Sequence, residues 1–122
     1  MKINIYGSTG IIGSKTLKLL IKYFPEIKIN LLFANNNYNK LISQCKIYKP
    51  QYICIKNSNL INKIKPKIKK NITIIEHKNL FMHLNKEKTD LSVLAISGYQ
   101  ALDYFNYILN NTKYLGLVNK EV

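Results

Sequence analysis

The stretch Lys-Ile-Asn-Ile-Tyr-Gly-Ser-Thr-Gly-Ile-Ile-Gly, residues 2–13, decides the fold of this chain. A short apolar strand leads directly into a turn with three glycines, and a helical pattern of apolar residues follows. A glycine-rich turn between a strand and a helix N-terminus is typical of loops that hold the pyrophosphate of a nucleotide. The spacing G-x-x-G-x-x-G is a variant of the Rossmann fingerprint. We therefore expect Gly7 to permit the tight turn, Gly10 to admit the phosphates, and Gly13 to let helix and strand pack closely.

Short β-branched strands alternate with helix-sized segments along the whole chain. The predicted strands are Lys2–Tyr6, Lys28–Phe33, Tyr52–Ile55, Ile72–Ile75, Leu91–Ala95 and Tyr114–Val118. The predicted helices are Gly10–Tyr23, Asn37–Tyr48, Asn59–Lys65, Asn79–Leu84 and Gln100–Asn110. This order predicts an α/β fold with a Rossmann-like, doubly wound, mainly parallel sheet of about six strands. The length of 122 residues indicates one domain.

The net charge of +13 comes from lysine alone, because all 19 basic residues are Lys. Recognition of bases and phosphates favours the bidentate fork of Arg. The chain is also rich in Asn and Ile, a bias that resembles the residue usage of AT-rich genomes. The densest basic run, residues 63–70, contains none of the aromatic residues that single-strand binders use. We therefore expect a solvated surface and no nucleic-acid partner, with a patch for polyanions as the alternative.

The sequence gives no sign of a membrane or secreted protein. No window approaches the roughly 18 uninterrupted apolar residues of a membrane span, and we expect no signal peptide. Cys45 and Cys54 match no metal or redox spacing, so we expect two buried thiols in a reducing compartment. The expected location is cytoplasmic.

The turn after the second predicted strand bears on the choice of dinucleotide. NAD-specific sites usually carry Asp or Glu there to hold the ribose 2′-hydroxyl, whereas this turn reads Ala34-Asn35-Asn36-Asn37. The only acid between residues 13 and 75 is Glu26, which precedes the strand. Because no carboxylate repels a 2′-phosphate, we expect NADP rather than NAD, with Asn amides donating to the phosphate and Lys40 adding charge. The alternative is a turn that is rich in Asn only because the whole chain is.

Four motifs lie in a characteristic order along the chain. They are Gly7-Ser8-Thr9-Gly10-Ile11-Ile12-Gly13, the turn at Asn37, Ala95-Ile96-Ser97-Gly98 and Leu117-Val118-Asn119-Lys120-Glu121. In this order and spacing they resemble the 1-deoxy-D-xylulose 5-phosphate reductoisomerase family. The resemblance covers the whole chain and implies that residues 1–122 correspond to the N-terminal NADPH-binding domain of that family.

The chain departs from the family pattern at three places. The family loop has Ser where Ile11 stands, so a hydroxyl near the phosphates is lost. Its second turn usually reads Gly-Arg/Lys-Asn, so Asn36 replaces a cation. The last motif of the family has Ala and Ser where this chain has Val118 and Val122, on either side of an intact Asn-Lys-Glu.

The resemblance also implies the site residues. Thr9, Gly10, Ile11 and Ile12 would contact the pyrophosphate, and Asn35, Asn36 and Asn37 the adenosine ribose. Asn119 and Glu121 would contact the cofactor toward its nicotinamide, and Lys120 would reach the substrate.

The implied reaction rearranges 1-deoxy-D-xylulose 5-phosphate and reduces it with NADPH to 2-C-methyl-D-erythritol 4-phosphate, in non-mevalonate isoprenoid biosynthesis. The family holds its Mg or Mn with carboxylates beyond the Asn-Lys-Glu motif, so we expect no metal ligand and no catalytic residue among these 122. The chain is expected to lack the family's catalytic and C-terminal domains and to be inactive alone. A homodimer is implied only for the full-length enzyme.

Two kinds of alternative remain at this point. The first is another reductase. A semialdehyde dehydrogenase needs a nucleophilic Cys in a later domain, and an extended short-chain dehydrogenase needs Tyr-x-x-x-Lys on a helix, whereas Tyr52 and Lys56 fall on a predicted strand. The second is a non-catalytic product, either a truncated relic or a lysine-rich anion-binding module.

Overall fold

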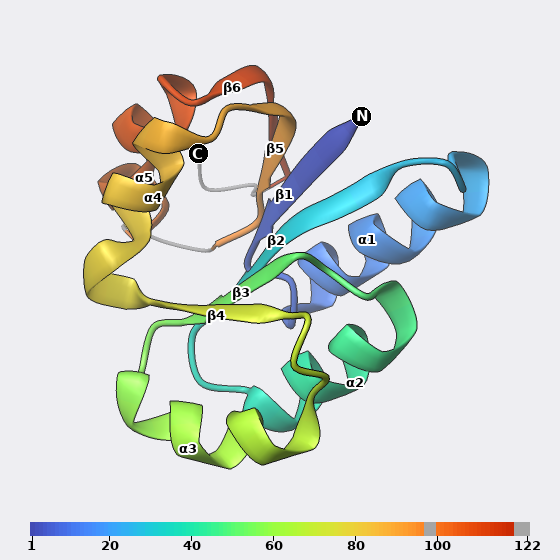
Figure 1. The fold of residues 1–122 in the computed structure, drawn as a ribbon. Coiled ribbons are helices and arrows are strands. Elements are labelled where there is room, and N and C mark those ends of the chain that lie inside the picture. Colours follow the sequence, from blue (N-terminus) through green and yellow to red (C-terminus); the bar gives the residue numbers. More distant parts are fainter. Residues whose placement is uncertain (97–99, 119–122) are drawn as a thin grey trace.

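The structure is a computed structural model that describes residues 1–96 and 100–118, and its strands and helices alternate along the chain (Figure 1). The strands are β1 (Lys2–Tyr6), β2 (Lys28–Ala34), β3 (Tyr52–Ile55), β4 (Thr73–Glu76), β5 (Thr89–Leu94) and β6 (Thr112–Leu117). The α-helices are α1 (Ile11–Tyr23), α2 (Tyr38–Tyr48), α3 (Ile61–Ile64), α4 (Leu80–Lys86) and α5 (Gln100–Leu109). Short 3-10 helices, η1 (Ser58–Leu60), η2 (Lys65–Lys67) and η3 (His77–Asn79), flank α3 and precede α4.

The six strands form one parallel sheet in the order β4-β3-β2-β1-β5-β6. The chain moves outward from β1 to β4 and then returns to place β5 on the other side of β1. The junction of β1 and β5 is therefore the switch point, outside which ligands bind at the carboxyl ends of the strands in open α/β sheets. The predicted Rossmann-like, doubly wound fold is confirmed.

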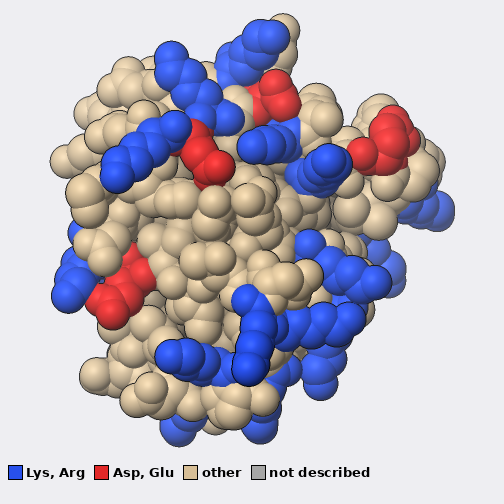
Figure 2. Space-filling model, in the orientation of Figure 1, with Lys and Arg blue, Asp and Glu red and all other residues tan. Residues whose placement is uncertain are grey.

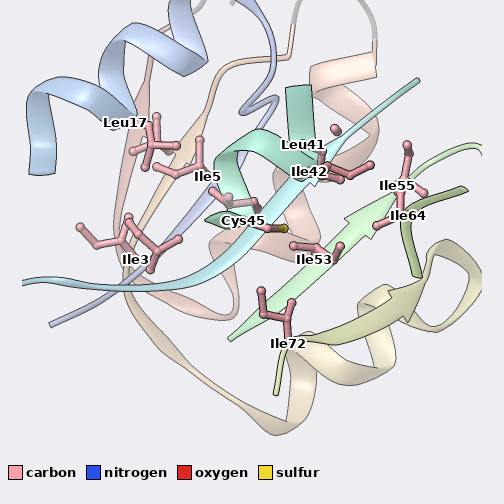
Figure 3. Close-up of a cluster of buried hydrophobic side chains, with 14 of the residues drawn as sticks. Ile3, Ile5, Leu17, Leu41, Ile42, Cys45, Ile53, Ile55, Ile64 and Ile72 are labelled. Atoms are coloured by element: carbon pink, nitrogen blue, oxygen red, sulfur yellow. The ribbon is translucent and has the colours of Figure 1, made fainter. Parts of the chain in front are cut away.

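Both faces of the sheet are buried, as helices on both sides require. One cluster packs Ile3 and Ile5 of β1 against Leu17 of α1 (Figure 3). The other packs Phe33 of β2 against Tyr104 of α5, with ring centroids 5.3 Å apart. Successive strand residues point to opposite faces, so each central strand contributes to both clusters. Because the central strands are packed on both faces, they are held in place, and so are the starts of the turns that follow their carboxyl ends.

The predicted elements differ from the observed ones mainly at their ends. The helix predicted over Asn59–Lys65 is a single α-turn with a 3-10 helix on each side, because Pro66 lies in η2 and lacks the N–H that a longer α-helix needs. Strands β5 and β6 each begin two residues earlier than predicted, since the ladder extends to the pair Thr89 and Thr112. No helix in the described part of the chain is both long and apolar enough to cross a membrane.

Candidate nucleotide-binding site

The glycine loop begins where β1 ends at the switch point. The N–H groups of Gly7 and Ser8 both donate to the carbonyl oxygen of Phe33 in β2, at 2.8 and 3.0 Å. Gly7 has φ +89°, and a Cβ there would lie 2.7 Å from the carbonyl oxygen of Ala95. Only glycine meets both conditions without strain. The loop is thus fastened to β2 and passes close to the chain that follows β5.

Gly10 is the N-cap of α1, and its backbone has few close neighbours. Its φ of −71° and ψ of 170° are extended, and it provides no side-chain cap. A Cβ at Gly10 would meet only the Gly7 carbonyl oxygen, at 3.6 Å. The first N–H groups of a helix have no intrahelical acceptor, and the helix dipole makes them attractive to anions. Because the side chains of Ile11 and Ile12 are exposed and the first turn has no acid, this end of α1 suits a phosphate.

Gly13 brings α1 onto the loop. A Cβ at Gly13 would lie 1.9 Å from the Gly7 carbonyl oxygen and 2.8 Å from its carbonyl carbon. Glycine is therefore required for the helix to approach the end of β1 this closely. The geometry thus agrees with the backbone roles expected of Gly7 and Gly13, and the role of Gly10 toward the phosphates stays a prediction.

A buried glutamine supports the loop from α2. Gln44 is 5% exposed and its Nε2 donates to the carbonyl oxygen of Ser8 at 2.8 Å. Sequence reasoning missed this residue. The available signal was a polar side chain on the same helical stripe as the buried Leu41 and Cys45. Gln44 is thus a positioning residue for the glycine loop.

Gln44→Glu tests that support. The substitution keeps the shape but turns an acceptor oxygen toward the Ser8 carbonyl, and burial raises the pKa of the new carboxyl. At neutral pH we expect a loss of about 2 kcal/mol in the free energy of unfolding. Below the raised pKa the neutral acid can donate to Ser8, so the loss should shrink at a lower pH. Urea unfolding at both pH values measures this, and equal effects from the exposed Gln51→Glu would contradict it.

The turn after β2 lies beside the glycine loop, because Tyr6 of β1 pairs with Phe33 of β2. Asn37 caps α2, with its Oδ1 accepting from the backbone N–H of Lys40 at 3.1 Å. Its oxygen is committed to the helix, so only the amide NH2 group is left to face a ligand. Asn36 is exposed and Asn35 is half-buried. No carboxylate stands at this turn, as its sequence shows.

Lys40 links the starts of the two helices. Its Nζ donates to Ser14 Oγ at 3.3 Å, and that hydroxyl donates to the Ile11 carbonyl oxygen at 3.2 Å. Ser14 is the second residue that the sequence did not single out. The contact brings the ammonium group of the half-buried Lys40 from the first turn of α2 to the first turn of α1.

Several motif residues, three of them predicted site residues, lie outside the described ranges. These are Ser97 and Gly98 of the third motif and Asn119, Lys120 and Glu121 of the last one. The neighbouring residue Val118 is described, and its N–H donates to the Leu94 carbonyl oxygen at 3.3 Å. The chain therefore leaves β6 at the carboxyl end of β5.

Other chemistries find no support among the residues that the structure describes. No three His, Cys, Asp or Glu side chains there group to hold a metal ion. Cys45 and Cys54 are buried free thiols, and burial raises the pKa of Cys45 to about 11 and that of Cys54 to about 12. Thiols held protonated in this way are poor nucleophiles. Tyr52 starts β3 and Lys56 follows its end, so they do not form the helical pair of a short-chain dehydrogenase.

Lysines gather on the part of the surface where Figure 1 places α2 and α3, at the lower right of Figure 2. A hollow of about 490 Å³ is lined there by Lys46, Lys49, Lys67 and Lys69 together with Cys45, Pro66, Ile68, Asn71 and Ile72. It lies at the C-terminal end of α2, whereas the candidate site lies at the N-terminal end. The lysine-rich surface and the glycine loop are therefore separate features.

Residues 3–122 match the family profile described as 1-deoxy-D-xylulose 5-phosphate reductoisomerase. Proteins of that name from Pelagibacter ubique and Wigglesworthia glossinidia brevipalpis are 38% and 34% identical to 98% and 99% of the chain. The chain spans 32% of the length of each.

Solved structures of reductoisomerases share the fold. The enzyme from Zymomonas mobilis in complex with NADPH gives a TM-score of 0.85 at 23% identity, over 98% of this chain and 32% of that one. A DOX-P reductoisomerase with fosmidomycin and magnesium gives 0.81 at 27% identity, over 99% of this chain and 31% of that one. These matches do not favour a lysine-rich anion-binding module or a reductase of another kind. Since the profile spans nearly every residue and the glycine loop lies at the switch point, the chain belongs to the 1-deoxy-D-xylulose 5-phosphate reductoisomerase family.

Proposed function

We propose that this chain is the NADPH-binding domain, residues 1–122, of a 1-deoxy-D-xylulose 5-phosphate reductoisomerase. The observation that carries the proposal is the glycine loop at the switch point, with few close neighbours around Gly10 and no carboxylate at the turn after β2. The first feature suits a pyrophosphate and the second suits a cofactor with a 2′-phosphate. The NADPH complex from Zymomonas mobilis is consistent with this assignment.

The proposed contacts follow the fold. The loop residues Thr9, Gly10, Ile11 and Ile12 would bind the pyrophosphate through their backbone, and Asn35, Asn36 and Asn37 would line the adenosine side. For the residues outside the described ranges, we keep the roles that the family resemblance implies. Asn119 and Glu121 would contact the nicotinamide half, and Lys120 would bind a substrate oxygen on which charge develops.

The whole enzyme would convert 1-deoxy-D-xylulose 5-phosphate to 2-C-methyl-D-erythritol 4-phosphate by rearrangement and reduction, a step of isoprenoid biosynthesis. NADPH supplies the hydride when bound. The described acids do not group into a metal site, so the ligands of a catalytic Mg or Mn would come from the family's catalytic domain. The contribution of this chain is to bind and orient the cofactor.

Two further parts of the proposal concern the setting of the enzyme. The full-length protein would be a homodimer and would act in the cytoplasm. The two free buried thiols agree with a reducing compartment, where disulfides are rare.

The proposal is tested by calorimetric titration of the complete natural protein with NADPH and with NADH. NADPH should bind more tightly than NADH, since only NADPH carries the 2′-phosphate. Inorganic tripolyphosphate should not compete effectively with NADPH, because it lacks the dinucleotide. Equal binding of NADPH and NADH, or NADPH binding that tripolyphosphate displaces and moderate salt abolishes, would instead indicate a nonspecific polyanion surface.

A further inference from the structure

The turn after β2 has no cation of its own, although a 2′-phosphate at neutral pH is largely a dianion. Asn35, Asn36 and Asn37 offer amide groups only. Lys40 stands three residues further on, in the first turn of α2. Its ammonium nitrogen lies 3.3 Å from Ser14 Oγ in α1, which is 26 residues away in the chain.

Two contacts set the position of Lys40. Its backbone N–H donates to Asn37 Oδ1, which places the residue at the start of the helix. Its side chain crosses to Ser14, whose hydroxyl is itself fixed by donating to the Ile11 carbonyl oxygen. The stem is half-buried, so fewer rotamers are open to Lys40 than to a fully exposed lysine.

The charge of Lys40 is not neutralised at this position. Its partner is a neutral hydroxyl, and the basic side chains found beside a carboxylate among residues 1–96 and 100–118 are Lys78, beside Glu76, and His83, beside Glu87. The chain has no acid between Glu26 and Glu76. Among the described residues no carboxylate pairs with Lys40, so an anion entering between α1 and α2 meets its ammonium group together with the positive end of α2.

We propose that Lys40 is the residue that recognises the 2′-phosphate of the cofactor and so sets the preference for NADPH over NADH. The inference rests on the proposed function and adds the residue that makes the site selective for NADPH over NADH. Lys40 supplies from the helix the charge that Asn36 does not supply from the turn. The ammonium group would donate a charge-assisted hydrogen bond to the phosphate, either in place of its hydrogen bond to Ser14 Oγ or in addition to it.

The test is calorimetric titration of the complete natural protein and of its Lys40→Met variant, each with NADPH and with NADH. Methionine keeps most of the stem and the backbone N–H that Asn37 caps, and removes the charge together with the hydrogen bond to Ser14 Oγ. NADPH binding should weaken about ten- to a hundredfold, the size of one lost charge-assisted hydrogen bond, while NADH binding stays within about twofold. Lys46→Met, on the same helix but at the exposed far end, should leave both affinities unchanged.

The outcomes separate this inference from the proposed function. If wild type prefers NADPH and Lys40→Met keeps that preference, the role of Lys40 is overturned and the NADPH-binding function stands. If Lys40→Met weakens NADPH and NADH equally, Lys40 supports the fold and does not select the cofactor. If wild type binds neither dinucleotide, both proposals fail. Lys40→Arg should keep the preference for NADPH over NADH, because arginine keeps the positive charge that methionine removes.

Discussion

Replacing Gly13 with alanine should destabilise the fold, because the added methyl group has no room beside the glycine loop. The new Cβ would lie 1.9 Å from the Gly7 carbonyl oxygen, a backbone atom held because Gly7 and Ser8 are fastened to Phe33. Relieving such a contact requires the helix or the loop to shift, at a cost of roughly 3 kcal/mol. The gain in helix propensity from Gly to Ala is about 1 kcal/mol and acts in the opposite direction. The net effect of Gly13→Ala should therefore be a loss of about 2 kcal/mol in the free energy of unfolding.

Urea unfolding followed by circular dichroism measures this difference. Gly116→Ala is the matched control, because a Cβ on Gly116 of β6 would meet nothing closer than the Ser92 carbonyl oxygen at 4.0 Å. We expect that variant to be as stable as wild type or slightly more so, since Gly is unfavourable in a strand. If Gly13→Ala were as stable as Gly116→Ala, this would contradict the close approach of α1 to the end of β1.

The fold could be predicted from sequence because apolar runs bounded by Pro, Gly and Asn recur at helix-and-strand intervals. Two features escaped that reading for physical reasons. The ladder between β5 and β6 extends to Thr89 and Thr112, where backbone hydrogen bonds continue although the apolar pattern has ended. The helix predicted over Asn59–Lys65 ends before Pro66, as expected of proline, but only Ile61–Ile64 form an α-turn and 3-10 helices lie on both sides of it.

The candidate site was predictable where it depends on glycine and not where it depends on contacts across the chain. The roles of Gly7, Gly10 and Gly13 follow from their spacing between a strand and a helix. The support by Gln44 and the link from Lys40 to Ser14 join α2 to the β1–α1 region, and only the tertiary structure brings these residues together. Asn37 also proved to have a structural use, as the cap of α2, that an Asn-rich sequence does not reveal.

Gly10→Val should have the opposite effect to Gly13→Ala, with a large loss of cofactor binding and little loss of stability. Gly10 has φ −71° and ψ 170°, a conformation that valine adopts readily, and its Cβ would find only the Gly7 carbonyl oxygen at 3.6 Å. Valine is a poorer N-cap than glycine, which costs about 1 kcal/mol or less. The two methyl groups, however, would occupy the space in front of the first N–H groups of α1. We therefore expect NADPH affinity to fall by about a hundredfold or more, because the pyrophosphate can no longer approach the backbone.

The same calorimetric titration and urea unfolding measure both halves of this expectation. Ile11→Ser is the matched control in the adjacent position: it removes a side chain that is 75% exposed and leaves the backbone N–H in place. It also adds a hydroxyl near the phosphates, so NADPH binding should be unchanged or tighter. Wild-type NADPH affinity in Gly10→Val would mean that the loop is only a turn and that the pyrophosphate binds elsewhere. A loss of affinity accompanied by a loss of stability as large as that of Gly13→Ala would mean that Gly10 serves the fold, because a pure binding defect leaves the unfolding curve in place.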